Sequence, residues 1–96
     1  QFSGATVRCT VRARPADTRG ALQMELNYSA GRAGDSGWQV FDLQPGFEDF
    51  SFEYDVPLLE GDQSVDYFGI RPVVPDKSRA LIVESVKFER LGRWAN

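Results

Sequence analysis

Apolar and polar residues alternate with a period of two along most of the chain. The first such stretch has an apolar residue at every second position: Ala5, Val7, Cys9, Val11 and Ala13. Arginine and threonine fill the positions between them. A period of two puts alternate side chains on opposite faces of a strand. We therefore expect a strand with one buried face and one solvated face, ended by Pro15.

Two further stretches alternate as clearly. One has these apolar residues on a single face: Leu22, Met24, Leu26 and Tyr28. The other, ended by Pro57, has Phe50, Phe52, Tyr54 and Val56. Between them lie a glycine-rich loop at 29–37 and a short strand at 38–43. The register of this short strand is open, because either Trp38 and Val40 or Phe41 and Leu43 can face the core.

The last third of the chain predicts two more strands. The fifth, at 64–74, places Phe68 and Ile70 inward and the following side chains outward: Val65, Tyr67, Arg71 and Val73. The sixth, at 79–91, changes phase between one apolar pair (Leu81 and Val83) and the next (Val86 and Phe88). A β-bulge at Glu84-Ser85 inserts one residue and returns both pairs to the core.

No segment has the three-four spacing of an amphipathic helix. Strands recur about every ten to fifteen residues with turn residues between them, a pattern typical of a sandwich or barrel. We therefore predict one all-β domain over residues 1–96, an antiparallel β-sandwich of about six strands. The chain begins without methionine, which suggests that it is an excised or C-terminal portion of a larger protein.

Charge and hydropathy narrow the range of partners. The net charge of −3 is unfavourable for binding nucleic acid, although Arg8, Arg12 and Arg14 provide local basicity. A nucleic-acid module that uses these three arginines is therefore the weakest alternative. No apolar stretch has the length that a bilayer-spanning helix needs, so we expect no membrane span.

The residues for common catalytic sites are missing from the sequence. There is no histidine, and the single cysteine, Cys9, lies on the apolar face of the first strand. A Cys/His zinc site and a histidine-activated nucleophile are thereby excluded. Glu53 and Asp55 share a strand face, where such carboxylates are usually solvated. We expect a domain that is not itself an enzyme and that uses no cofactor and no metal.

A binding surface remains as the functional alternative. Aromatic rings stack on the C–H face of a sugar, and planar polar groups reach its hydroxyls. Tyr67 and Arg71 offer that mixture on the outward face of the fifth strand. The polar face of the first two strands offers it as well, with Arg8, Arg12, Gln23, Glu25 and Asn27. These polar residues also fit cross-strand charge pairing, and we favour that interpretation. Trp38 fits either a stacking platform or a core tryptophan, of which we favour the second.

The order of these features resembles the jelly-roll carbohydrate-binding modules of bacterial glycan-active enzymes. The resemblance rests on the runs ATVRCTVRARPADTRGALQMELNY, GWQVFDL, FEDFSFEYDVP, DYFGIRPVV and ALIVESVKFERL. It includes Arg12-Ala13 before a loop, a Trp-led strand, and Val56-Pro57 after an aromatic strand. In those modules the closing strand often reads Ile-Asp-Asn-Val, where this chain has Val83-Glu84-Ser85-Val86. The Glu-Ser pair weakens the expectation of the calcium that the family's Asp-Asn often helps to hold.

The resemblance implies a jelly roll that binds a polysaccharide or oligosaccharide without catalysis. It implies a catalytic domain in the same parent protein, such as a glycoside hydrolase, and an extracellular or periplasmic location. The family usually has one or two strands before the first strand seen here, so an edge strand is absent or is supplied by the parent enzyme. The predicted sugar-binding residues are Tyr67, Arg71, Trp38, Arg12 and Asn27.

A structural domain that packs against a catalytic neighbour and binds no sugar is the alternative. It predicts an apolar patch on an outer face, formed by Val65, Tyr67 and Val73.

Overall fold

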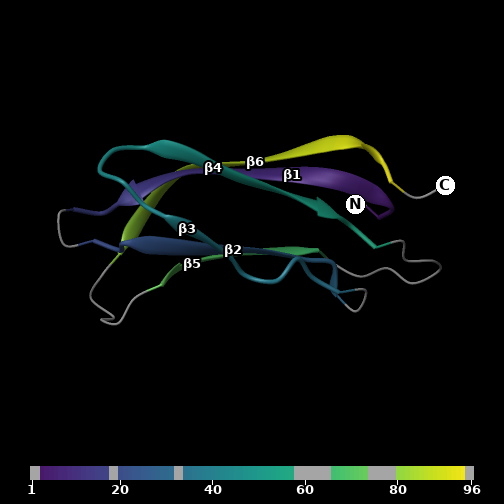
Figure 1. Cartoon of the computed structure of the whole chain (residues 1–96), viewed down its shortest axis with the longest axis horizontal. Helices are drawn as coiled ribbons and strands as arrows, with labels where there is room; N and C mark the ends of the chain where they lie inside the picture. Colours follow the sequence, from purple (N-terminus) through teal and green to yellow (C-terminus); the bar gives the residue numbers. More distant parts are fainter. Residues whose placement is uncertain (1–2, 18–19, 32–33, 58–65, 74–79, 95–96) are drawn as a thin grey trace.

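Two antiparallel sheets make up the part of the chain that the computed structural model describes, residues 3–17, 20–31, 34–57, 66–73 and 80–94. The strands are β1 (Ala5–Pro15), β2 (Gln23–Ser29), β3 (Gln39–Asp42), β4 (Glu48–Asp55), β5 (Tyr67–Val73) and β6 (Leu81–Arg93). One sheet has the order β4-β1-β6 and the other β3-β2-β5. They lie face to face, as Figure 1 shows. The prediction of an all-β sandwich is confirmed.

The two central strands supply most of the core. All five apolar side chains of the first predicted strand are fully buried in β1, and Met24, Leu26 and Tyr28 of β2 are buried opposite them. A central strand has a neighbour on each side and a sheet above it, so its inward side chains lose nearly all contact with water. Burying a side chain the size of leucine contributes about 1.5–3 kcal/mol. Alternation in β1 and β2 therefore fixes which face of each sheet is inside.

Aromatic side chains from the edge strands join the two sheets. Phe41 of β3 lies 5.8 Å from Phe50 of β4, measured between ring centres. Phe68 of β5 makes an edge-to-face contact with Phe88 of β6 at 5.1 Å. Such pairs contribute about 0.5–1.5 kcal/mol beyond their buried area. Aromatic rings therefore hold the edges of the sandwich together, whereas aliphatic side chains fill its centre.

The register of β3 is decided in favour of Phe41 and Leu43. Phe41 is opposite Met24 and packs against the core, and Leu43 is buried. Trp38 and Val40 are exposed, so the expectation that Trp38 is a core residue is wrong. The physical reason is parity: once Phe41 enters the core, residues at even positions of this strand must point to solvent.

The predicted bulge in β6 is confirmed. Arg12 is opposite Ser85 and Ala13 is opposite Val83, which leaves Glu84 as the extra residue. A second irregularity, which the sequence pattern did not reveal, leaves Leu91 as an extra residue near the end of the strand. β6 ends at Arg93, two residues beyond the predicted end. The predicted positions 64, 65, 74 and 79 lie outside the described residues.

Candidate functional site

The solvent-facing side of the β3-β2-β5 sheet gathers four of the five predicted binding residues. We call it the Trp38 face and define it by Gln23, Glu25, Asn27, Trp38, Val40, Tyr67, Gly69 and Arg71. The strand register places Arg71 opposite Glu25, and Gly69 opposite Asn27. Val40 is opposite Glu25 on the other side of β2. Residues far apart in the sequence therefore share one surface.

Trp38 lies directly before β3, and its ring reaches across to β5. Its indole is 39% exposed. A Cβ placed on Gly69 would lie 2.9 Å from Cη2 of Trp38, closer than real Cβ atoms approach. The Trp38 ring therefore packs directly on Gly69, and any side chain at position 69 displaces the ring. The sequence reasoning missed Gly69, although a glycine inside a strand pattern is a signal of close approach.

Arg71 covers one face of this indole. Its guanidinium carbon lies 3.8 Å from the centre of the Trp38 ring. Its Nε–H donates a hydrogen bond to Oε1 of Glu25 at 2.7 Å. The guanidinium is thus held from two directions, by a ring and by a carboxylate. Arg71 therefore stacks on one face of the indole, and Trp38 remains partly exposed.

The loop between β2 and β3 positions Trp38 through Ser36. The Ser36 hydroxyl accepts a hydrogen bond from the Tyr28 backbone N–H at 3.0 Å and lies 3.1 Å from Oδ1 of Asn27. The Gln39 side chain donates to the Ser36 carbonyl at 2.9 Å. Gly37 has a φ of +75°, a conformation that favours glycine at this turn. The backbone on either side of Trp38 is therefore anchored to the sheet.

Tyr67 supplies a second exposed ring on the same face. It is 64% exposed and is opposite Ser29 of β2. It stands two residues from Gly69 along β5, a separation of about 7 Å in a strand. The Trp38 face therefore carries two exposed aromatic side chains, with amide and charged groups beside them.

Arg12, the fifth predicted binding residue, lies on the β4-β1-β6 sheet and not on the Trp38 face. β1 and β2 belong to different sheets, so the expectation that their polar sides form one face is wrong: the two sides point in opposite directions. Arg12 pairs with Asp49 at 3.3 Å and with Glu84 at 2.7 Å, and these contacts raise its pKa, the hydrogen bond to Asp49 most of all. Cross-strand charge pairing is confirmed for this arginine.

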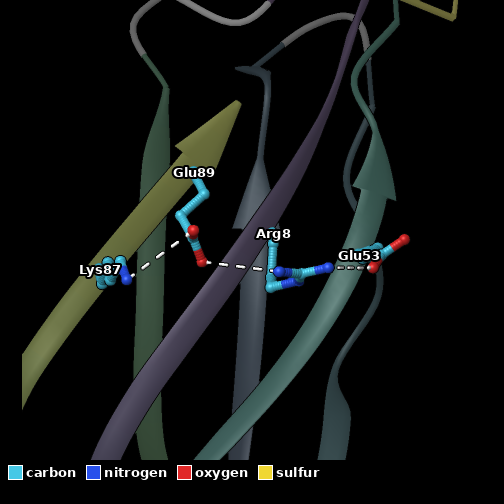
Figure 2. A network of polar contacts seen from close by, with 4 residues as sticks. All are labelled: Arg8, Glu53, Lys87 and Glu89. Carbon is cyan, nitrogen blue, oxygen red and sulfur yellow. Dashed lines mark hydrogen bonds and ion pairs between the residues drawn. The ribbon is translucent and has the colours of Figure 1, made fainter. Parts of the chain in front are cut away.

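The Arg8 guanidinium is paired in the same manner on the same sheet. It lies 3.2 Å from the Glu53 carboxylate and 3.8 Å from that of Glu89. Figure 2 shows these contacts crossing from β4 through β1 to β6. The outer side of the β4-β1-β6 sheet is therefore a set of ion pairs.

Among the described residues, the titratable groups of Cys9 and Tyr28 are buried. Burial raises the pKa of the Cys9 thiol to about 12, so it stays protonated at neutral pH. Burial also raises the pKa of Tyr28, whose hydroxyl donates to Asp66, and the Asp66 contact adds to this effect. Among the described residues, no three Cys, Asp or Glu side chains are grouped as a metal site would require.

A separate cleft of about 310 Å³ opens between the ends of β1 and β3. Its lining is mainly apolar and includes Leu22, Leu43 and Pro45. Arg14 also lines it, and its guanidinium donates to the carbonyls of Pro15 and Ala16 and lies over the Phe47 ring. None of the predicted binding residues lines this cleft.

The apolar patch predicted for a purely structural domain is only partly described. Tyr67 is exposed and Val73 is half-buried, whereas Val65 lies outside the described residues. No helix in the described part of the chain is long and apolar enough to cross a bilayer.

Comparison with protein-family models found no match, and neither did searches of curated proteins and of solved structures. Any functional assignment therefore rests on the residues themselves.

Proposed function

We propose that this chain is a non-catalytic carbohydrate-binding domain that contacts a polysaccharide or oligosaccharide through the Trp38 face. The observation that carries the proposal is the set of contacts that hold the Trp38 ring in place. Exposing a tryptophan to water on a sheet surface is unfavourable, yet here contacts with Gly69 and Arg71 and the Gln39–Ser36 hydrogen bond hold Trp38 in place. Holding a ring in place before a ligand arrives lowers the entropy lost on binding.

The polar groups beside the rings suit a sugar. A pyranose presents C–H bonds on its faces and hydroxyls around its rim. On the Trp38 face, an indole and a phenol provide the apolar contacts. Arg71 has five N–H donors, of which Nε–H is bonded to Glu25. Its remaining donors and the Asn27 amide suit the hydroxyl groups of a ligand stacked on Trp38.

The strand order supports a jelly-roll topology as part of the same proposal. The chain passes from one sheet to the other between β1 and β2, β3 and β4, β4 and β5, and β5 and β6. Repeated crossing between two antiparallel sheets is typical of the jelly roll. In this proposal the domain is an accessory to an enzyme that acts on a polysaccharide outside the cytoplasm.

Affinity electrophoresis against a panel of neutral and acidic polysaccharides tests the proposal. We expect the wild-type chain to be retarded by at least one glycan and Trp38→Ala to migrate as in a gel without glycan. Trp94→Ala is the matched control, because Trp94 is also exposed but lies after β6. Absence of retardation on every glycan, or equal loss in both variants, would contradict the proposal.

A further inference from the structure

β6 has an open edge and uncovered apolar side chains. Among the described strands it pairs with β1 alone, so no described strand adjoins its other side. Val86 and Phe88 point toward the core from opposite Val11 and Cys9, yet each is 40% exposed. Among the strands that the structure describes, none continues this sheet beyond β6 to cover them. This edge has the features of a strand that accepts another strand.

The charges on the outer side of this sheet indicate which kind of strand can pair with the open edge of β6. Glu53, Arg8 and Glu89 lie side by side across β4, β1 and β6, in a row of alternating sign (Figure 2). The row ends at the open edge with Glu89. The next row ends there with Lys87, whose ammonium lies 3.8 Å from the Glu89 carboxylate. A complementary strand needs a cation opposite Glu89 and an anion opposite Lys87.

β6 itself is such a strand. Its regular part, 85–90, lies between the two extra residues, Glu84 and Leu91. If a second copy runs antiparallel with Phe88 opposite Phe88, then Lys87 is opposite Glu89 and Glu89 is opposite Lys87. Centring the two-fold axis on Lys87 or on Glu89 places that residue opposite its own copy, and like charges opposite each other destabilise a sheet. Of the registers centred on 87, 88 and 89, the charge pattern therefore favours the one with Phe88 on the axis.

We propose that two copies of this chain pair through β6, around a two-fold axis at Phe88, to form one continuous six-stranded sheet. Each Phe88 ring then covers the other, and the aliphatic stem of Arg90 lies against Val86 of the second copy. The axis is perpendicular to the sheet, so both Trp38 faces point to the same side. The dimer does not depend on what the Trp38 face binds, although two sites on one side strengthen binding to a polymer.

Disulfide trapping tests the register. Residues directly opposite in an antiparallel pair have Cα atoms about 4.5–5.5 Å apart, within the range that a disulfide spans. Phe88→Cys should therefore oxidise to a covalent dimer on a non-reducing gel. Val86→Cys is the matched control: it has the same strand, face and exposure. In this register its two copies lie about 13 Å apart along the strands, too far to bridge. Equal trapping of both variants, or of neither, overturns the proposal.

Sedimentation equilibrium provides a second test that leaves Phe88 in place. The wild-type chain should self-associate at about tens of micromolar, and Lys87→Glu should raise the dissociation constant about tenfold or more. Ser51→Glu is the control, because it adds negative charge on β4, at the edge of the sheet opposite β6. A wild-type chain that stays monomeric up to about 1 mM, or a Lys87→Glu variant that associates as well as wild type, overturns the proposal.

Discussion

Arg71 stacks on Trp38, with its guanidinium carbon 3.8 Å from the centre of the indole. Trp38 and Arg71 are more than thirty positions apart in the sequence, and both are exposed. This contact fixes the orientation of the Trp38 ring beside β3. Several measurable properties depend on that orientation.

The first prediction concerns the energy of this stack. In a double-mutant cycle with Trp38→Ala and Arg71→Ala, the two changes should be coupled by about 0.5–1 kcal/mol, as measured by urea unfolding. Arg71→Lys keeps the charge near Glu25 but loses the planar contact, so it should recover only part of this energy. Full recovery by lysine would show that the contact is a simple charge effect.

The second prediction concerns the contact between Gly69 and the Trp38 ring. Gly69→Ala places a methyl group 2.9 Å from Cη2 of Trp38, so the indole must move away from the sheet. We expect a changed near-ultraviolet circular dichroism spectrum and weaker glycan retardation, with the far-ultraviolet spectrum preserved. Val40→Ala, on the same face, is the control and should leave the tryptophan signal unchanged.

The third prediction separates the two outer surfaces. Arg12→Ala removes contacts to Asp49 and Glu84 on the sheet opposite the Trp38 face. Glycan retardation should therefore be unaffected, whereas Arg71→Ala should reduce it. If Arg12→Ala abolishes binding and Arg71→Ala does not, the binding surface lies on the β4-β1-β6 sheet.

The fourth prediction concerns stability at high pH. Burial raises the pKa of Cys9 from 9.0 to about 12, and burial also raises the pKa values of Tyr28 and Tyr54. In each case the unfolded chain loses its proton at a lower pH than the folded chain. Their stabilising contribution is therefore complete below about pH 9 and declines as the pH rises further.

Urea unfolding between pH 8 and pH 11 measures this decline. One such group lowers the free energy of unfolding by up to about 1.4 kcal/mol per pH unit in its window. Cys9→Ala removes one of the three groups and should make the decline shallower from pH 9 upward. An unchanged slope in Cys9→Ala would show that the thiol does not contribute.

Local pattern defined most of the strands, although it left the register of β3 open and placed Leu22, which is exposed, on the core face. The alternation in β1 and β2 and the bulge at Glu84 are properties of short segments, because each strand must present its apolar residues to one side. The same reasoning predicted that Tyr67 and Arg71 point outward on β5, and they do. It also identified Cys9 as a core residue.

Only the tertiary structure decided which strands share a sheet. That choice depends on pairing between distant segments, β1 with β4 and β6, and β2 with β3 and β5. It separates Arg12 from Asn27, although both had been expected on one polar face. It also brings Trp38, Gly69 and Arg71 together, because a side chain on β5 can receive the indole only when β3, β2 and β5 lie in one sheet. Alternation specifies the inner and outer side of a strand, whereas neighbours across a sheet are set by long-range packing.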